Sequence, residues 1–396
     1  MRPQTASVAF ILATLGLDAL GIGLVIPIVP ALVRMLSGLG AGQAAGWVGA
    51  LVATYAAAQF CAAPVLGGLS DRFGRRPVIV LSLAGTAANY ILLALAPSVA
   101  WLFVGRLLAG ATASNMAAAN AYIADVTPPE QRSARFGLVG AAFGAGFVFG
   151  PALGGALGAI DLRLPFAVAA ALALANAAYG ALVLPESLPV ERRRRFSWKR
   201  ANPAGSLHTL AADRPVARIA VAWCCAWFGL GALQSCFVLS MGMRFGWGPQ
   251  QNGWALATVG ICQALTQALL VRPVIRRIGE RRAAFAGFAL SGAAFAMLGL
   301  ATQGWQIYAA LAVEALGAVA TPAMRALLSA RAGPTRQGEM QGGLSSVEGL
   351  TAIVAPLLSA GLFEWATQAG GAAWAGAPFL LGTAAYAVAA LALARS

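Results

Sequence analysis

Apolar runs of about 20 residues recur along the whole of this 396-residue chain and are separated by short polar segments. A helix of that length crosses the roughly 30 Å hydrocarbon layer of a bilayer. Hydrophobic residues make up 59% of the chain and charged residues only 10%, whereas a soluble domain carries about 25% charged residues. A soluble protein with a large core would show shorter runs and amphipathic periodicity. We therefore predict an all-α integral membrane protein.

Counting the apolar runs predicts twelve transmembrane helices. They cover approximately residues 7–33, 47–69, 78–97, 100–123, 136–158, 164–184, 217–241, 253–273, 284–303, 305–329, 340–363 and 374–394. The longest polar segment, 185–216, lies between the sixth and seventh runs. We expect an N-terminal six-helix bundle at 1–184, a central cytoplasmic loop at 185–216 and a C-terminal six-helix bundle at 217–396.

The basic residues predict the orientation of these helices. The net charge is +14, which could suggest nucleic-acid binding, but the arginines lie in alternate short loops between apolar runs. Cytoplasmic loops attract such an excess of Arg and Lys. With both termini cytoplasmic, only Arg34, Arg163 and Arg244 fall in outer loops, and Arg106 lies within a span. We expect a multi-pass protein in contact with lipid and not with nucleic acid.

Two related loops indicate an internal repeat. Leu69-Ser70-Asp71-Arg72-Phe73-Gly74-Arg75-Arg76 follows the second predicted helix, and Val274-Ile275-Arg276-Arg277-Ile278-Gly279-Glu280-Arg281 follows the eighth. Transporters built from two repeats place their substrate site between the halves, near the middle of the membrane.

Enzyme and metal-site signatures are missing from the sequence. It contains no phosphate-binding Gly-Lys-Ser/Thr loop, no Gly-x-Ser-x-Gly element and no cluster with metal-ligand spacing. The five cysteines all fall in apolar runs, and the single histidine, His208, lies in a loop. We therefore expect no catalytic residues, no cofactor and no metal site, with the cysteines packed as small apolar side chains.

Asp18 and Arg106 are the first candidate functional residues, because each lies inside an apolar span. A charge at that depth must face protein or a water-filled cavity. Removal from water favours the neutral form of a carboxyl group, which suits reversible protonation of Asp18. Arg106 needs an acid or backbone carbonyls as partners, and Asp18 is the natural one if their spans face one cavity. The alternative is a static ion pair that fixes helix packing.

Two further acids, Glu314 and Glu348, lie in the tenth and eleventh predicted spans. By the same argument each should face the cavity or a partner. We expect one of them to bind a proton or a cationic substrate in the second half. Alternatively, either glutamate pairs with Arg325 or extends to the membrane interface.

Uncharged polar residues within the spans are candidates for the wall of a substrate cavity. They are Gln59, Asn89, Asn115, Asn120, Gln234 and Gln263. Such side chains also join neighbouring helices through hydrogen bonds, so only part of this set is expected to line the path.

The loop after the second span packs charges and glycines tightly between two membrane helices. Its candidate gating residues are Gly67, Asp71, Arg72, Gly74, Arg75 and Arg76, and Asp125 at the end of the fourth span is expected to join them. Asp71 can pair with an arginine or face a helix N-terminus. We expect this network to stabilise one conformation of a gate rather than to touch substrate.

The fifth span carries small residues and a proline at Gly146, Gly150, Pro151, Gly154 and Gly155. Small residues allow close contact between helices, and Pro151 removes a backbone hydrogen bond and bends the helix.

The loop at 67–78 resembles the signature loop of the major facilitator superfamily, a large class of secondary transporters. The motif around Pro151 resembles that superfamily's antiporter motif. Residues 10–160 resemble its tetracycline/proton antiporter branch most closely, through Leu17 to Leu24 and Gly105 to Leu108. The resemblance implies twelve helices, a monomer in the bacterial inner membrane and proton-driven efflux of an amphiphilic drug. It also implies proton relay by Arg106.

This chain departs from that branch at three membrane positions. Asn89 and Ser291 stand where the branch has aspartates, and Gln263 stands where it has a histidine. The family ties these positions to coupling or to the metal–drug chelate, so Mg²⁺ would enter only as part of a chelated drug. The departures give weight to a metabolite or sugar-like uniporter or symporter as the alternative. A non-transporting receptor or scaffold would have no use for Asp18 and Arg106.

Overall fold

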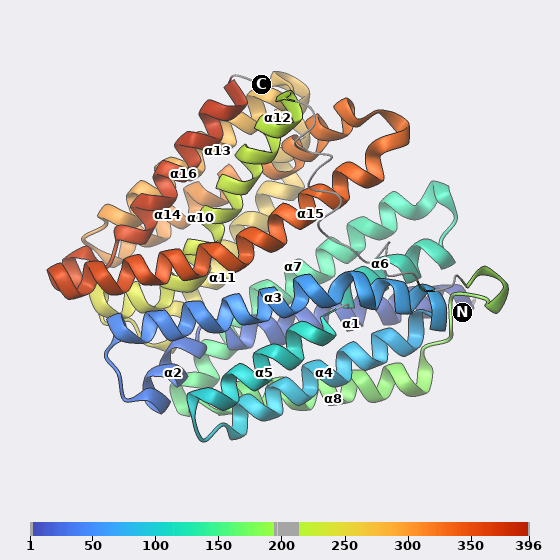
Figure 1. Cartoon of the computed structure of the whole chain (residues 1–396), viewed down its shortest axis with the longest axis horizontal. Helices are drawn as coiled ribbons and strands as arrows, with labels where there is room; N and C mark the ends of the chain where they lie inside the picture. Colours follow the sequence, from blue (N-terminus) through green and yellow to red (C-terminus); the bar gives the residue numbers. More distant parts are fainter. Residues whose placement is uncertain (1–2, 114, 194–195, 197–213, 395–396) are drawn as a thin grey trace.

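The computed structural model is an assembly of long helices, with no strand in the residues that it describes, namely 3–113, 115–193, 196 and 214–394. The first group of helices comprises α1 (Pro3–Val25), α2 (Val29–Ser37), α3 (Ala41–Phe73), α4 (Arg75–Leu95), α5 (Val99–Thr112), α6 (Asn115–Val126), α7 (Pro129–Ile160) and α8 (Leu164–Val183). A short 3₁₀ turn, η1 (Val190–Arg192), follows. Figure 1 shows their arrangement along the molecule.

The second group begins with α10 (Arg214–Phe245). It continues with α11 (Pro249–Leu265), the π-helical turn η2 (Thr266–Leu270), α12 (Val271–Ile278), α13 (Glu280–Leu300), α14 (Gly304–Gly317), α15 (Ala320–Gly370), the 3₁₀ turn η3 (Gly371–Trp374) and α16 (Ala377–Ala394). The turn η2 joins α11 to α12, so that these three elements form one interrupted rod.

Ten helical segments of the described chain are long and apolar enough to cross a membrane, which confirms a multi-pass membrane protein. The number becomes eleven if α1 and α2, which meet at an angle of 44°, form one broken span. The predicted helix at 100–123 corresponds to α5 and α6, each too short to cross a bilayer alone. The residues predicted as a loop between 329 and 340 are helical and belong to α15. A change from apolar to polar residues marks where a helix leaves the membrane, not where it ends.

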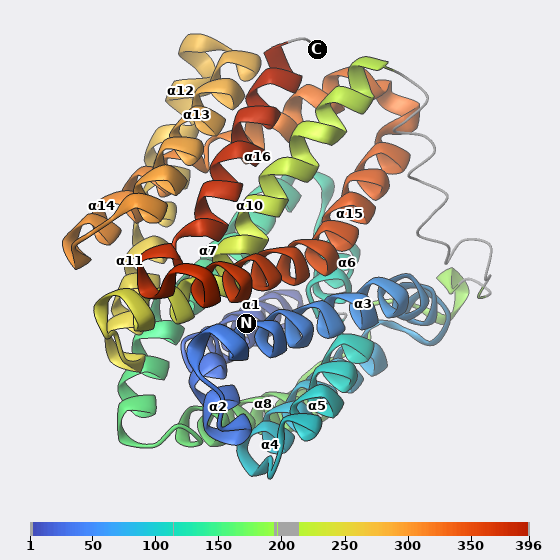
Figure 2. The same ribbon diagram turned by 60° about the vertical axis from the view of Figure 1, so that its left-hand side comes forward.

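Within each group the helices pack on one another, and a buried cluster that includes Leu51, Leu239 and Phe363 joins the two groups. α1 packs on α7 and α8, and α4 packs on α5 and α8; in the second group, α10 packs on α15 and α16, and α13 packs on α14 and α16. One cluster of buried side chains comes entirely from 216–393 and another entirely from 10–184. The two groups meet where α3 packs on α15 and α7 packs on α11 (Figures 1 and 2).

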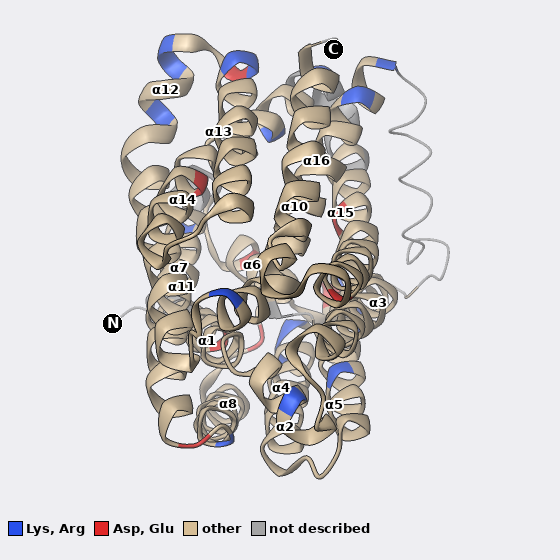
Figure 3. Cartoon of the chain, turned by 90° about the vertical axis from the view of Figure 1, so that its left-hand side faces the viewer, with Lys and Arg blue, Asp and Glu red and all other residues tan. Residues whose placement is uncertain are grey.

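Contact between the groups is tightest at one end of the molecule. A Cβ atom added to Gly49 on α3 would lie 2.6 Å from the Cβ of Ala360 and 2.7 Å from the carbonyl oxygen of Pro356. At the other end, positions 67, 137 and 140 have no described atom close enough to meet an added Cβ. The two groups therefore diverge, as Figure 1 shows, toward the end that carries the arginines at 72–76 and 276–282, which we call the arginine-rich end. Figure 3 shows the basic residues around α12 and the start of α13 at this end.

The repeated loops have matching backbones and matching arginine contacts. Gly74 and Gly279 both have positive φ, 111° and 78°, and both have ψ of 164°. Two residues further on, the guanidinium of Arg76 donates to the carbonyl of Ala181 near the end of α8. The guanidinium of Arg281 likewise donates to the carbonyls of Leu393 and Ala394 at the end of α16, at 3.2 and 2.8 Å. In each group the loop thus holds the last helix by its C-terminal carbonyls, which favour a cation.

Replacement of Gly150 by Ala tests the packing of α7 against α1. The added Cβ would lie 2.7 Å from the Cα of Gly23 and 2.7 Å from the carbonyl oxygen of Leu20, both backbone atoms that cannot move aside cheaply. We expect the variant to lose about 1–3 kcal/mol of stability through overpacking. Gly144→Ala on the same helix is the matched control, because its Cβ would meet no atom within 4 Å. Thermal unfolding of the purified proteins in detergent should show a lower midpoint for Gly150→Ala only, and equal midpoints would contradict the packing.

Candidate functional site

A cavity of about 110 Å³ lies among α10, α11, α13, α14, α15 and α16 of the second group. Its polar wall is formed by Gln263, Ser291, Glu314 and Thr321, and its aromatic wall by Trp223, Trp227, Phe288 and Tyr386. Trp223 and Trp227 are one helical turn apart on α10, and their ring centres are 6.3 Å from each other. The cavity therefore combines a carboxyl group and an amide with aromatic surface, although its volume is smaller than the roughly 300–1,000 Å³ of pockets that hold drug-sized ligands.

Glu314 is the buried acid of this cavity, with 6% of its surface exposed. Its Oε2 accepts a hydrogen bond from Nε2 of Gln263 at 3.4 Å. None of the ion pairs found among the described residues includes Glu314. A carboxylate removed from water needs a cation or must take up a proton. Glu314 therefore has the surroundings of a group that binds one or the other.

Glu348 has a different environment, because a cation already balances it. Its Oε1 lies 3.3 Å from Nη2 of Arg325 and accepts a hydrogen bond from Nε1 of Trp223 at 3.1 Å. The guanidinium carbon of Arg325 also lies 5.6 Å from the ring centre of Trp223. The alternative stated from the sequence, a pair with Arg325, is thus the arrangement that Glu348 adopts. Through Trp223 this pair borders the cavity of Glu314.

Asp18 and Arg106 belong to a second polar cluster, in the first group of helices. The guanidinium carbon of Arg106 on α5 lies 5.9 Å from the ring centre of Tyr55 on α3. A Cβ atom added to Gly21, three residues after Asp18 on α1, would lie 3.0 Å from the hydroxyl oxygen of Tyr90 on α4, so α1 and α4 also meet at this cluster. The contact recorded for the guanidinium of Arg106 is thus with an aromatic ring between α3 and α5.

Asn89 lies beside this cluster on α4 and is 3% exposed. Its Oδ1 has no hydrogen-bond partner in the described structure. A Cβ atom added to Gly105 would lie 3.0 Å from that oxygen, so α5 packs closely against one side of it. Because a buried acceptor without a donor is unfavourable, Asn89 is a place where a water or substrate donor would be stabilised.

The other predicted cavity residues are dispersed. Gln59 and Asn120 are partly buried on α3 and α6, and Gln234 on α10 is exposed. The side chain of Asn115 lies outside the part of the chain that is described. Of the predicted polar set, only Gln263 lines the cavity of Glu314.

The loop between α3 and α4 forms the charged network predicted for it. Nη1 of Arg75 lies 2.6 Å from Oδ1 of Asp71, and Nε of Arg75 lies 3.2 Å from Oδ2 of Asp125 on α6. Arg75 thus joins two acids from different helices. Arg72 points away from both pairs, with its guanidinium carbon 5.0 Å from the ring centre of the exposed Phe73.

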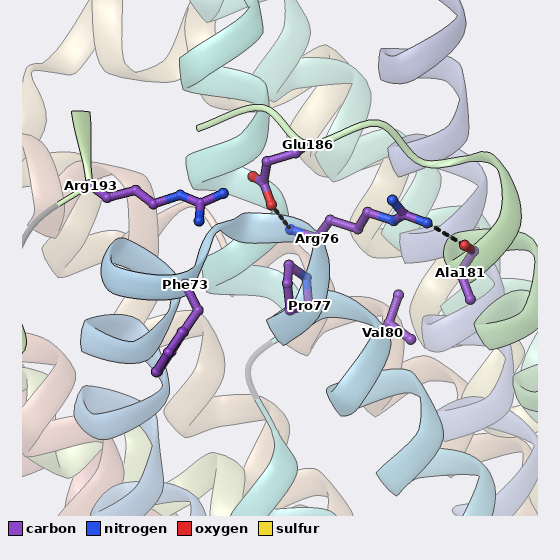
Figure 4. A pocket seen from close by; sticks show the side chains of 7 residues that line it. All are labelled: Phe73, Arg76, Pro77, Val80, Ala181, Glu186 and Arg193. Atoms are coloured by element: carbon purple, nitrogen blue, oxygen red, sulfur yellow. Dashed lines mark hydrogen bonds between the residues drawn. The ribbon is translucent and has the colours of Figure 1, made fainter. Parts of the chain in front are cut away.

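Glu186 is a member of this network that the sequence analysis missed. Its Oε1 accepts hydrogen bonds from the backbone N–H groups of Arg75 and Leu188 at 2.8 and 3.0 Å. Its Oε2 accepts one from the backbone N–H of Arg76 at 3.3 Å, which Figure 4 shows. The carboxylate thereby caps the N-terminus of α4, a favourable place for an anion. Its position directly after the sixth apolar run, in a Pro-Glu-Ser turn, was the available signal.

The glycines around Pro151 face two different helices. Cβ atoms added to Gly146, Gly150 or Gly154 would meet the backbone of α1, whereas one added to Gly155 would lie 2.6 Å from the carbonyl oxygen of Pro249 on α11. Pro151 itself packs over Gly23, whose added Cβ would lie 2.7 Å from the proline Cδ. This segment of α7 therefore holds α1 within its own group and also forms part of the contact between the groups.

No group of three or more His, Cys, Asp or Glu side chains that could hold a metal ion occurs within the described residues. All five cysteines are free; Cys61 and Cys224 are exposed rather than packed inside, which corrects the expectation that every cysteine is buried.

The long apolar helices and the charged loop between α3 and α4 define an all-helical, multi-pass membrane protein. Comparison with known proteins identifies its family. The family model described as Major Facilitator Superfamily matches residues 11–244 and 219–395, and the chain belongs to this family.

Its similar relatives include two tetracycline resistance proteins. The chain is 38% identical to the class C protein of Escherichia coli over 97% of its own length and 96% of that protein. It is also 38% identical to the class D protein of Salmonella ordonez, over 93% of its length and 92% of that protein. Among solved structures, the nucleoside transporter NupG covers the whole chain with a TM-score of 0.76 at 15% identity, over 99% of the NupG chain, and so shares the fold.

Replacement of Asp71 by Asn tests the network around Arg75. The change removes the ion pair at 2.6 Å but leaves the cavity of Glu314 untouched. We expect transport to slow about fivefold, since a partly exposed ion pair contributes up to about 1 kcal/mol, while substrate affinity stays the same. Asp161→Asn, at the opposite end of the first group, is the control. Transport rates in vesicles and equilibrium binding to purified protein separate the two effects, and a loss of affinity alone would contradict a gating role.

Proposed function

We propose that this chain exports an amphiphilic, tetracycline-like drug in exchange for protons. The observation that carries the proposal is the buried carboxyl group of Glu314, which faces an aromatic cavity and is held by the neutral amide of Gln263. An acid in that environment exchanges readily between a proton and a cationic or hydrogen-bonding ligand. The names and coverage of the tetracycline resistance relatives support a drug as the substrate.

In this proposal the chain forms twelve transmembrane helices in two six-helix halves, 1–184 and 217–396, joined by a cytoplasmic loop at 185–216. The broken pair α1–α2 and the interrupted pair α5–α6 each form one crossing, as do α11 with α12 and α14 with the start of α15. Support comes from the matching loops at Gly74 and Gly279, which hold the last helix of their own group.

The arginine-rich end faces the cytoplasm, as the preference of Arg for cytoplasmic loops requires. Both termini are then cytoplasmic, and the protein works as a monomer in the bacterial inner membrane. The conformation described here, closed near Gly49 and Ala360 and diverging at the arginine-rich end, corresponds to access from the cytoplasm. Substrate enters there, and rocking of the halves exposes it to the outside.

Protonation provides the driving force for this exchange. A proton entering the cell gains about 2.3 kcal/mol per 100 mV of membrane potential. Glu314 and Asp18 take up protons from the outside, substrate leaves, and release of the protons to the cytoplasm restores the binding form. Arg106 sets the charge balance around Asp18, and Glu348 remains paired with Arg325 unless substrate competes for the carboxylate. No catalytic chemistry is involved, and Mg²⁺ takes part only when it arrives chelated to the drug.

A second candidate function is an uncoupled metabolite carrier of the same fold. Asn89 and Ser291 favour it, because both can hydrogen-bond a hydroxylated substrate and neither can exchange a proton. Ser291 lines the cavity of Glu314, and Asn89 has a buried acceptor without a partner. Proton movement upon substrate addition distinguishes the two functions.

Substrate-induced proton release in inverted vesicles tests the proposal. A pH-sensitive dye reports protons while tetracyclines and other amphiphilic drugs are added to the wild type, Asp18→Asn, Glu314→Gln and Glu348→Gln. Because proton exchange needs a titratable group, we expect release to disappear in Asp18→Asn and Glu314→Gln and to decrease only partly in Glu348→Gln. Glu364→Gln is the matched control, since Glu364 lies on α15 near Gly46 at the tightly packed end.

Two outcomes would contradict this account. Drug-induced proton release that is intact in Glu314→Gln would remove Glu314 from the coupling. Substrate counterflow without any proton release would favour the uncoupled carrier.

A further inference from the structure

A second hollow, of about 320 Å³, lies outside both polar clusters, at the arginine-rich end of the first group of helices. It is lined by Phe73, Arg76, Pro77, Val80, Ala181, Glu186 and Arg193. These residues come from the end of α3, the start of α4, the end of α8 and the segment after α8. Figure 4 shows Arg76 and Arg193 on either side of Glu186, with apolar side chains below them.

The residues that line this hollow carry more positive than negative charge. Glu186 is the only acid among the described residues that line it, and three backbone N–H groups already use the carboxylate oxygens of Glu186. Nε of Arg193 is buried and has no hydrogen-bond partner in the described structure. Arg76 uses one nitrogen on the carbonyl of Ala181, which leaves its other donors for a ligand. A buried guanidinium donor without an acceptor indicates that an anion completes the site.

An exposed apolar stripe on α4 begins in the same hollow. Pro77, Leu81, Ala84, Ile91 and Leu95 are all exposed and follow one another at intervals of three, four or seven residues, which places them on one face of the helix. This face runs from the arginines along most of the length of α4. On α8, Leu182 is also exposed next to the hollow-lining Ala181. In a membrane-spanning chain such a face meets lipid acyl chains.

We propose that the hollow binds the headgroup of an anionic phospholipid, with an acyl chain along the α4 stripe. The phosphodiester accepts hydrogen bonds from Arg193 and Arg76, and the apolar side chains below them contact the glycerol and the first methylene groups. Basic pockets between helices at the cytoplasmic side are suited to such headgroups. The site does not depend on the transported substrate, and its bound lipid would contact the loop whose Arg75 joins Asp71 to Asp125.

Native mass spectrometry of the purified full chain in detergent tests the site by titration with phosphatidylglycerol. The variants are Arg76→Gln and Arg193→Gln. Their matched controls are Arg281→Gln, which loses the equivalent helix-end contact in the second group, and Arg277→Gln, which loses an exposed charge at the same end. We expect affinity for the first bound phosphatidylglycerol to fall about fivefold in each pocket variant and to stay unchanged in both controls. Size-exclusion profiles confirm that each variant is folded.

The ligand chemistry is tested with two further probes, phosphatidylcholine and glycerol phosphate. Weaker retention of phosphatidylcholine than of phosphatidylglycerol by the wild type, and no such difference in Arg193→Gln, would support an anionic headgroup. Displacement of phosphatidylglycerol by millimolar glycerol phosphate would overturn the lipid assignment in favour of a soluble phosphate compound. Equal loss of affinity in pocket and control variants would overturn the site altogether, because it would show attraction to the whole basic surface.

Discussion

The high free energy of a charge in hydrocarbon is the constraint on which the rest of this structure depends. It restricts most arginines to the ends of the helices, where Arg76, Arg281 and their neighbours hold helix C-termini. The few charges deeper in the molecule lie between helices and beside aromatic rings, as Arg106 does with Tyr55. Among the described residues, Glu314 is a buried acid that belongs to none of the ion pairs found, and the account of function rests on it.

Close contact between helix backbones is the second constraint on this structure, and it acts both within the first group and between the two groups. Within the first group, glycines of α7 admit the backbone of α1, so that these two long helices behave as one unit. Between the groups, Gly49 and Gly155 allow α3 and α7 to approach α15 and α11 closely, and the contact continues as far as Gly349 beside Phe60 and Gly260 beside Phe147. Two groups of helices that are each packed internally and that diverge at the arginine-rich end can rock about the contact between them.

The sequence predicted the helical membrane fold, the charged loop and the positions of the deep acids, because each depends on local composition. It could not predict which acid is paired: Glu314 and Glu348 look alike in sequence, yet Glu348 contacts Arg325 whereas Glu314 contacts only an amide among its described partners. That difference depends on how α14 and α15 pack on α10 and α11. The cap that Glu186 places on α4 was missed for the same reason, since 110 residues separate Glu186 from Arg76. The helical segment at 330–339 was missed because polarity was taken as the end of a helix.

Transport driven by a proton gradient alone tests the central claim most directly. The purified chain would be reconstituted into liposomes without any nucleotide, and a pH gradient would be imposed by dilution while drug uptake is followed. The account predicts accumulation of drug above its external concentration on the acidic side, and loss of that accumulation when an ionophore removes the gradient. Equilibration of the drug to equal concentrations, regardless of the gradient, would contradict proton coupling.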